Sequence, residues 1–152
     1  MTPDQNAVPA RPANSDTTRS WTPVVLPDLP PPAGAYSPGV RTANGLLFVS
    51  GQTPRNPATG QIEGSTVEEQ TRVTLANLER ILLAGGATLR DVVSVTVYLA
   101  DEKDWGTFDA VYRTVFTAPF PTRAVVGASL RGILVEIAAI AVLPQAVPQA
   151  AG

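Results

Sequence analysis

One arginine and one glutamate are the strongest candidates for chemistry, because each interrupts an apolar segment. Arg123 precedes the apolar run 124–128, and Glu136 lies inside the strand-like run 133–142. In a β-strand, the face that carries Glu136 also carries three apolar side chains (Leu134, Ala138 and Ile140). Burying an unpaired carboxylate there would cost several kcal/mol, so Glu136 needs a partner, a water or a function. An arginine at the mouth of an apolar strand is suited to a two-pronged grip on a carboxylate.

Both residues also have purely structural interpretations. Glu136 could pair with a neighbouring strand, and Arg123 could pair with Glu136 or with Asp109. Two further positions are weaker candidates. Tyr36 stands where the ordered part of the chain is predicted to begin, where aromatic residues usually pack. Gly51, after Ser50 at a predicted strand end, would allow close approach of a ligand or backbone, although most such glycines only make turns.

Composition narrows the possible chemistry. The 152 residues contain no Cys and no His, which excludes disulfides, thiolate nucleophiles, zinc fingers, iron–sulfur sites and Ser-His-Asp triads. A metal site would need carboxylates alone, and we find no such cluster in the sequence, so we expect no metal. With 11 Lys plus Arg against 13 Asp plus Glu, the net charge of -2 gives no reason to bind nucleic acid. Phosphate-loop, dinucleotide and nucleophile-elbow motifs are absent from the sequence.

The prolines divide the chain into an arm, a domain and a tail. Of the 15 Pro, eight fall in the first 32 residues, so residues 1–32 are predicted to be a disordered Pro-rich arm. The apolar cluster around Trp21 could dock on the domain, but the sequence favours an arm that is flexible throughout. Residues 33–143 are predicted to fold, and 144–152 to form a flexible tail. Without a signal-like start or a membrane-length apolar run, we expect a cytoplasmic protein with no membrane partner.

Local patterns predict the secondary structure. A hairpin is expected from strands 40–43 and 46–50 with an Asn44-Gly45 turn. A helix should begin at a capping box made by Thr66 and Glu69 and end at Gly85-Gly86. Its predicted buried stripe contains five residues (Val67, Thr71, Leu75, Leu78 and Leu82).

The second half of the domain shows the same kinds of pattern. Residues 93–99 alternate as a strand, with Val93, Val95, Val97 and Leu99 expected on one face. Asp104 is expected to cap a second helix that ends before Pro119 and Pro121. Its predicted buried side contains six residues (Trp105, Phe108, Val111, Tyr112, Val115 and Phe116). Strands 123–129 and 133–142 complete the domain.

This β-β-α-β-α-β-β order predicts an α+β fold in which two helices cover one face of a mixed sheet of about five or six strands. No helix is left for the other face, which carries small and mildly polar residues such as Ser94, Thr96 and Tyr98. A sheet with one uncovered, half-apolar face favours self-association.

Together these segments resemble the Rid family of reactive-intermediate deaminases, also called the YjgF-like family. The resemblance covers residues 33–143 and rests on the order and spacing of several short motifs (Gly34-Ala35-Tyr36-Ser37, residues 47–52, Leu75-Ala76-Asn77-Leu78, Pro121-Thr122-Arg123 and Leu134-Val135-Glu136-Ile137). It implies a chorismate-mutase-like fold assembled as a homotrimeric barrel, with three active sites in clefts between subunits. Members like the archetype hydrolyse 2-imino acids to 2-keto acids and ammonia without a cofactor or metal.

The resemblance also assigns roles. Arg123 matches the arginine that binds the substrate carboxylate, and Glu136 matches the glutamate that holds the attacking water. Tyr36 matches the tyrosine that closes the site, and Ser50-Gly51 matches the strand end that lines the pocket.

Two positions depart from the family pattern. Asp109 stands where many members have Asn, and it could repel an acid substrate or pair with Arg123. Val125 replaces a Cys or Ser, which leaves only backbone groups to meet the substrate. These departures favour one alternative, a specialised relative acting on another pathway enamine or imine. A second alternative, from another class of function, is a non-catalytic trimer that binds small metabolites or a partner protein.

Overall fold

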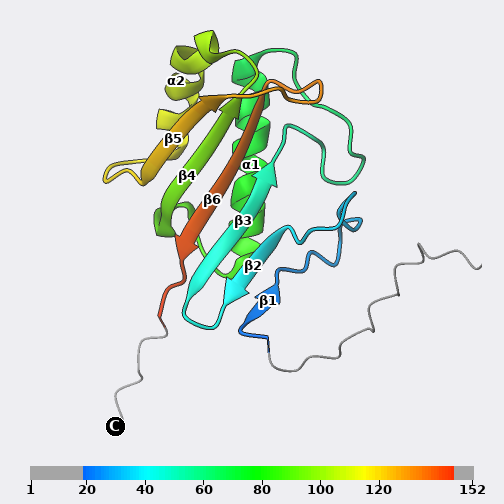
Figure 1. The fold of residues 1–152 in the computed structure, drawn as a ribbon, viewed down its shortest axis with the longest axis vertical. Helices are drawn as coiled ribbons and strands as arrows, with labels where there is room; N and C mark the ends of the chain where they lie inside the picture. The colour runs from blue at the N-terminus through cyan, green and yellow to red at the C-terminus, as the bar shows by residue number, and fades with distance from the viewer. Residues whose placement is uncertain (1–18, 146–152) are drawn as a thin grey trace, which may run out of the picture.

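Six strands form one mixed sheet in the order β1-β2-β3-β6-β4-β5 in the computed structural model, which describes residues 19–145 (Figure 1). The strands are β1 (Trp21–Pro23), β2 (Gly39–Thr42), β3 (Leu46–Gln52), β4 (Val92–Leu99), β5 (Thr122–Gly127) and β6 (Val135–Val142). Only the β4–β5 pair is parallel among these strands. Helices α1 (Val67–Gly85) and α2 (Trp105–Val115) lie behind the sheet in Figure 1. The predicted α+β fold, with a mixed sheet and two helices, is confirmed.

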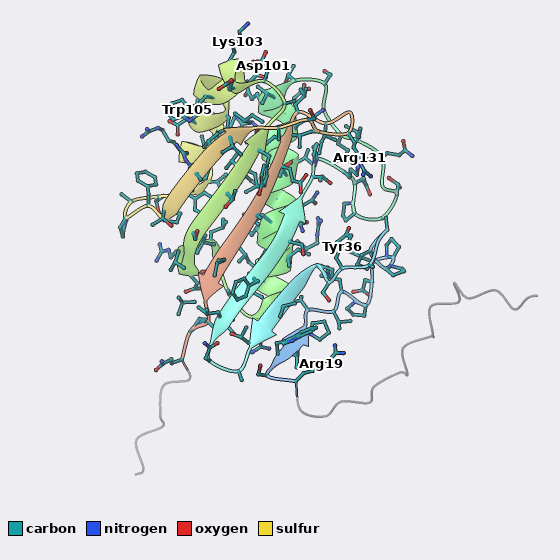
Figure 2. All side chains as sticks on the ribbon, in the orientation of Figure 1. Arg19, Tyr36, Asp101, Lys103, Trp105 and Arg131 are labelled. Atoms are coloured by element: carbon teal, nitrogen blue, oxygen red, sulfur yellow. The ribbon has the colours of Figure 1, made fainter. Side chains whose placement is uncertain are left out.

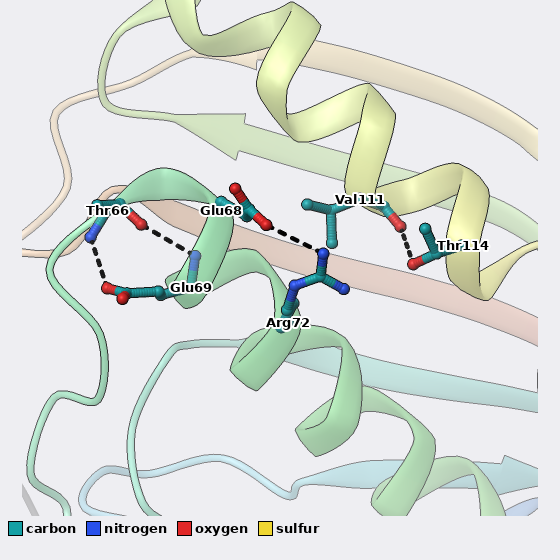
Figure 3. Close-up of polar contacts among 6 residues, drawn as sticks. All are labelled: Thr66, Glu68, Glu69, Arg72, Val111 and Thr114. Carbon is teal, nitrogen blue, oxygen red and sulfur yellow. Dashed lines mark hydrogen bonds and ion pairs between the residues drawn. The ribbon is translucent and has the colours of Figure 1, made fainter.

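Helix α1 begins and ends where the sequence predicts. The backbone N–H of Glu69 donates to Thr66 Oγ1 at 3.2 Å, and the backbone N–H of Thr66 donates to Glu69 Oε2 at 3.2 Å, which completes the capping box (Figure 3). The helix ends at Gly86, whose φ of 89° is the left-handed conformation that glycine adopts most easily. The predicted stripe is buried throughout.

Alternation in β4 decides which residues face the helices. Val95, Val97 and Leu99 are buried against them, while Thr96 and Tyr98 lie on the other face. The expectation for Val93 was wrong, because the β4–β6 register shifts between Val92 and Ser94. This irregularity buries Val92 and leaves Val93 exposed.

Helix α2 differs from the prediction at its first turn. Asp104 precedes the helix but makes no capping hydrogen bond with its side chain. A short 3₁₀ turn (Glu102–Asp104) comes first, and Asp101 accepts from the N–H of Lys103 at 2.9 Å. Phe108, Val111, Tyr112 and Phe116 are buried as expected, but Trp105 stays 46% exposed and Val115 is only half-buried.

The N-terminal boundary also needs correction. The sequence predicts a disordered arm over residues 1–32, yet Trp21–Pro23 pair with β2. Val24 is buried, and its N–H donates to the carbonyl of Gly39 at 2.8 Å. A proline is tolerated there because β1 is an edge strand. The rest of the predicted arm (1–18) and residues 146–152 of the predicted tail lie outside the described residues.

Within residues 19–145, both helices lie on one face of the sheet, and no helix covers the other face. Its side chains are apolar or weakly polar apart from Glu136, and most are half-buried or exposed (Phe48, Thr96, Tyr98, Ala124, Val126, Glu136, Ala138 and Ile140). We call this surface the open face. No helix in the described part of the chain has the length and apolarity needed to cross a bilayer.

Candidate functional site

Arg123 lies on the helix-covered face near the start of β5. Its register partner is Val95, which is buried beneath the helices. The guanidinium carbon lies over three aromatic rings of α2, at 4.5 Å from the Tyr112 centroid, 5.6 Å from Trp105 and 5.7 Å from Phe108. Because a cation is attracted to aromatic faces, these rings hold the guanidinium in one place.

Asp109 joins Arg123 to a second arginine. Asp109 is buried. Its Oδ1 forms an ion pair with Arg123 Nη1 at 2.9 Å, while its Oδ2 accepts a hydrogen bond from Arg113 Nε at 2.7 Å. The hydrogen bond from Arg113 is the main cause that lowers the pKa of the Asp109 carboxyl; burial opposes the shift, and Arg123 adds to it. Of the structural pairings considered for Arg123, the one with Asp109 is formed.

These residues surround a small cavity of about 270 Å³ at the edge of the sheet (lined by Asp109, Tyr112, Arg113, Phe120, Pro121 and Arg123). Burial raises the pKa of Tyr112 to about 12, so its hydroxyl is neutral near pH 7. Val125 shares this face but packs against the core and is not part of the cavity wall. We call Asp109, Arg113 and Arg123 the arginine half-site.

Glu136 lies on the open face, where its register partner in β4 is Tyr98. The β3–β6 register shifts by one residue between Val49 and Gln52, which forms a β-bulge at Ser50-Gly51. The bulge brings Gly51 against the Glu136 carboxylate. A Cβ on Gly51 would lie 2.9 Å from the Glu136 carboxyl carbon and would overlap Oε1, so only glycine allows this approach.

Ser50 connects Gly51 to the segment that carries Tyr36. Its Oγ donates to the carbonyl of Ser37 at 2.6 Å, and its N–H donates to the carbonyl of Pro38 at 3.0 Å. Tyr36 is 55% exposed, and it lines a cavity of about 430 Å³ together with Gly51. We call Tyr36, Ser50, Gly51 and Glu136 the glutamate half-site.

The sequence interpretation missed two arginines near Glu136. A cavity of about 410 Å³ is lined by Glu136 and by Arg55 and Arg131. Figure 2 shows Tyr36 and Arg131 on one side of the molecule and Trp105, which contacts Arg123, on the other. Within residues 19–145, acidic side chains do not gather in threes as a metal ion would require.

The structure therefore separates the predicted site residues into two half-sites. The register pairs Arg123 with Val95 and Glu136 with Tyr98, three residues further along β4 and on the opposite face. The arginine half-site presents cations beside aromatic rings, which suits an organic anion. The glutamate half-site presents a carboxylate that can accept a proton or hydrogen bond from water.

Comparison with known proteins identifies the family. Residues 27–143 match the family model described as endoribonuclease L-PSP, to which the YjgF-like and Rid proteins belong. The chain belongs to this family. A RutC family protein from Pyrococcus horikoshii is 41% identical over 114 residues, which cover 74% of this chain and 90% of the relative. The 2-iminobutanoate/2-iminopropanoate deaminase of Mus musculus is also 41% identical, over 115 residues that cover 74% of this chain and 84% of the relative.

Solved structures of other Rid family members have the same fold. Escherichia coli TdcF, solved with bound serine, has a TM-score of 0.73 and 33% identity and covers 81% of this chain, with 99% of its own length matched. The Escherichia coli YjgF gene product has a TM-score of 0.72 and 34% identity, covering 80% of this chain and 98% of its own. The family resemblance predicted from the motifs is confirmed.

Proposed function

We propose that this Rid family protein hydrolyses reactive 2-imino acids, such as 2-iminopropanoate, to 2-keto acids and ammonia at sites shared between copies of the chain. The observation that carries the proposal is the placement of Arg123 and Glu136, each beside a cavity and on opposite faces of one sheet. The name of the mouse relative supports the choice of reaction.

Arg123 would bind the substrate carboxylate. Nη1 forms an ion pair with Asp109, and the opposite edge of the guanidinium, with Nε and Nη2, has the geometry for two parallel hydrogen bonds to a carboxylate. Because the aromatic rings and Asp109 already fix the guanidinium, little conformational freedom is lost on binding. The imine carbon is thereby held in one orientation.

Glu136 would direct a water to that carbon. An imine carbon is electrophilic, so the reaction needs no cofactor to activate it. Glu136 accepts a proton as the water oxygen bonds to the carbon and the C=N bond becomes single. That proton then passes to the nitrogen, which gives the neutral carbinolamine. Glu136 next takes the proton of the new hydroxyl group and delivers it to the nitrogen, so the C–N bond breaks, ammonia leaves and the C=O bond forms.

A homotrimer would bring the half-sites together. Because the Arg123 and Glu136 side chains project from opposite faces of the sheet, one copy does not place both at a single imine carbon. The open face has the apolar character of a surface that another copy covers. In a closed ring, the arginine half-site of each copy would meet the glutamate half-site of the next, and Tyr36 would close the cleft.

The direct test measures the hydrolysis of imines that an amino-acid oxidase generates in situ. The readout is the rate of keto-acid formation above the uncatalysed rate. The proposal predicts acceleration by the wild type and its loss in Arg123→Ala. An unchanged rate in Arg123→Ala would overturn it. Keto-acid binding without turnover would instead support the metabolite-binding alternative, and activity only on a bulky imine would support the specialised one. Cytoplasmic location stays a prediction, to be tested by cell fractionation.

A further inference from the structure

Arg113 is a mostly exposed residue of α2, yet its charge is directed at the buried half-site. Its Nε donates to Asp109 Oδ2 at 2.7 Å, and the remaining oxygen, Oδ1, forms an ion pair with Arg123 Nη1 at 2.9 Å. The same cavity is lined by all three side chains. Each carboxylate oxygen of Asp109 therefore takes one guanidinium.

The charges in this cluster decide whether an anion can enter. Asp109 alone would cancel Arg123, and a substrate carboxylate would meet a neutral pair with a carboxylate beside it. Arg113 adds a second cation, so the three side chains carry a net charge of about +1. The other lining residues, Tyr112, Phe120 and Pro121, bring no charge near pH 7.

We propose that Arg113 is a positioning residue that offsets Asp109 and so keeps Arg123 able to bind a carboxylate. It holds the Asp109 carboxylate between two cations, so the edge of the Arg123 guanidinium with Nε and Nη2 stays available to the ligand. Asp109 and Arg113 thus act as a coupled pair, in which Arg113 is needed because Asp109 is charged. This inference rests on the proposed role of Arg123 in binding the substrate carboxylate.

The test is calorimetric binding of pyruvate, the keto acid that 2-iminopropanoate would give, to the full chain and four variants. Arg113→Ala should weaken the affinity about tenfold, corresponding to about 1.4 kcal/mol. Adding Asp109→Asn to Arg113→Ala should restore the affinity to within about threefold of wild type, because the uncompensated charge is gone. Asp109→Asn alone should bind at least as tightly as wild type.

The matched control is Arg72→Ala. Arg72 of α1 pairs with Glu68 at 3.1 Å with the same four-residue spacing (Figure 3). Neither residue lines the cavity. The substitution should leave pyruvate affinity unchanged. Methyl pyruvate, which lacks the charge, should bind all variants alike.

Three results would overturn the inference: wild-type affinity in Arg113→Ala, no rescue in the double variant, or no pyruvate binding by the wild type. Rescue by Asp109→Asn is a result that a merely structural role of Arg113 would not give. Binding does not depend on turnover, so the expected affinities without imine hydrolysis would leave this inference intact and reject the proposed reaction.

Discussion

The side chains of Arg123 and Glu136 project from opposite faces of the same sheet. Arg123 shares the helix-covered face with its register partner Val95, whereas Glu136 shares the open face with Tyr98. In the proposed mechanism, a substrate carboxylate bound by Arg123 would therefore lie on the face of the sheet opposite that copy's own Glu136. This relationship makes assembly part of the proposed mechanism, beyond any effect on stability.

Replacing Glu136 by Gln should lower kcat about 100-fold or more, because a general base typically contributes that much. Pyruvate affinity should stay near the wild-type value, since Gln keeps the shape and Arg123 is unchanged. Steady-state kinetics with imines generated in situ measure kcat, and calorimetry measures the pyruvate affinity. A kcat equal to that of the wild type would remove Glu136 from the mechanism.

Replacing Gly51 by Ala should reduce kcat about 10- to 100-fold, because the new Cβ would push the Glu136 carboxylate from its position. Gly106→Ala is the matched control. A Cβ there meets nothing within 4 Å, and alanine favours the α2 helix by about 1 kcal/mol. Equal kinetics for the two variants would show that Gly51 has no special role.

The lowered pKa of Asp109 predicts that the free energy of unfolding falls in acid. Its folded pKa is lowered, so the unfolded chain binds the proton more readily. The stabilisation is fully present above the ordinary Asp pKa of about 3.9 and is lost as pH falls through the lower folded value. Denaturant unfolding of wild type and Asp109→Asn should show a stability difference that shrinks with acidification. A difference independent of pH would contradict this assignment.

The buried position of Val24 predicts that the segment after β1 is part of the fold. Val24→Ala should reduce the free energy of unfolding by about 2 kcal/mol, since two buried carbons are lost. Its exposed neighbour Val25 is the control, and Val25→Ala should change stability by less than about 0.5 kcal/mol. Equal values from denaturant unfolding would place Val24 outside the folded core.

Short-range features of the fold could be predicted from the sequence. The Thr66 and Glu69 capping box depends on groups three residues apart, and the burial of Val95 and Val97 follows from simple alternation. Strand β1 was missed because its partner, β2, lies about twenty residues away in a Pro-rich region. Val93 was misassigned because the register shift depends on pairing with β6.

The candidate site was predictable by residue type but not by arrangement. Arg123 and Glu136 were found because each interrupts an apolar segment, but the faces they occupy follow from strand register. Arg113 lies four residues after Asp109, a spacing at which helical side chains meet. That signal was available, but the shared contact of Asp109 with Arg123 needed the tertiary structure.

The most direct test of the shared site uses mixed oligomers of two inactive variants. Arg123→Ala and Glu136→Gln chains with different tags would be co-expressed, and assemblies that carry both tags would be purified and assayed on imines. In a mixed trimer, one of the three clefts combines a native Arg123 with a native Glu136, so about one third of wild-type activity should return. Mixed assemblies as inactive as either variant alone would contradict the account.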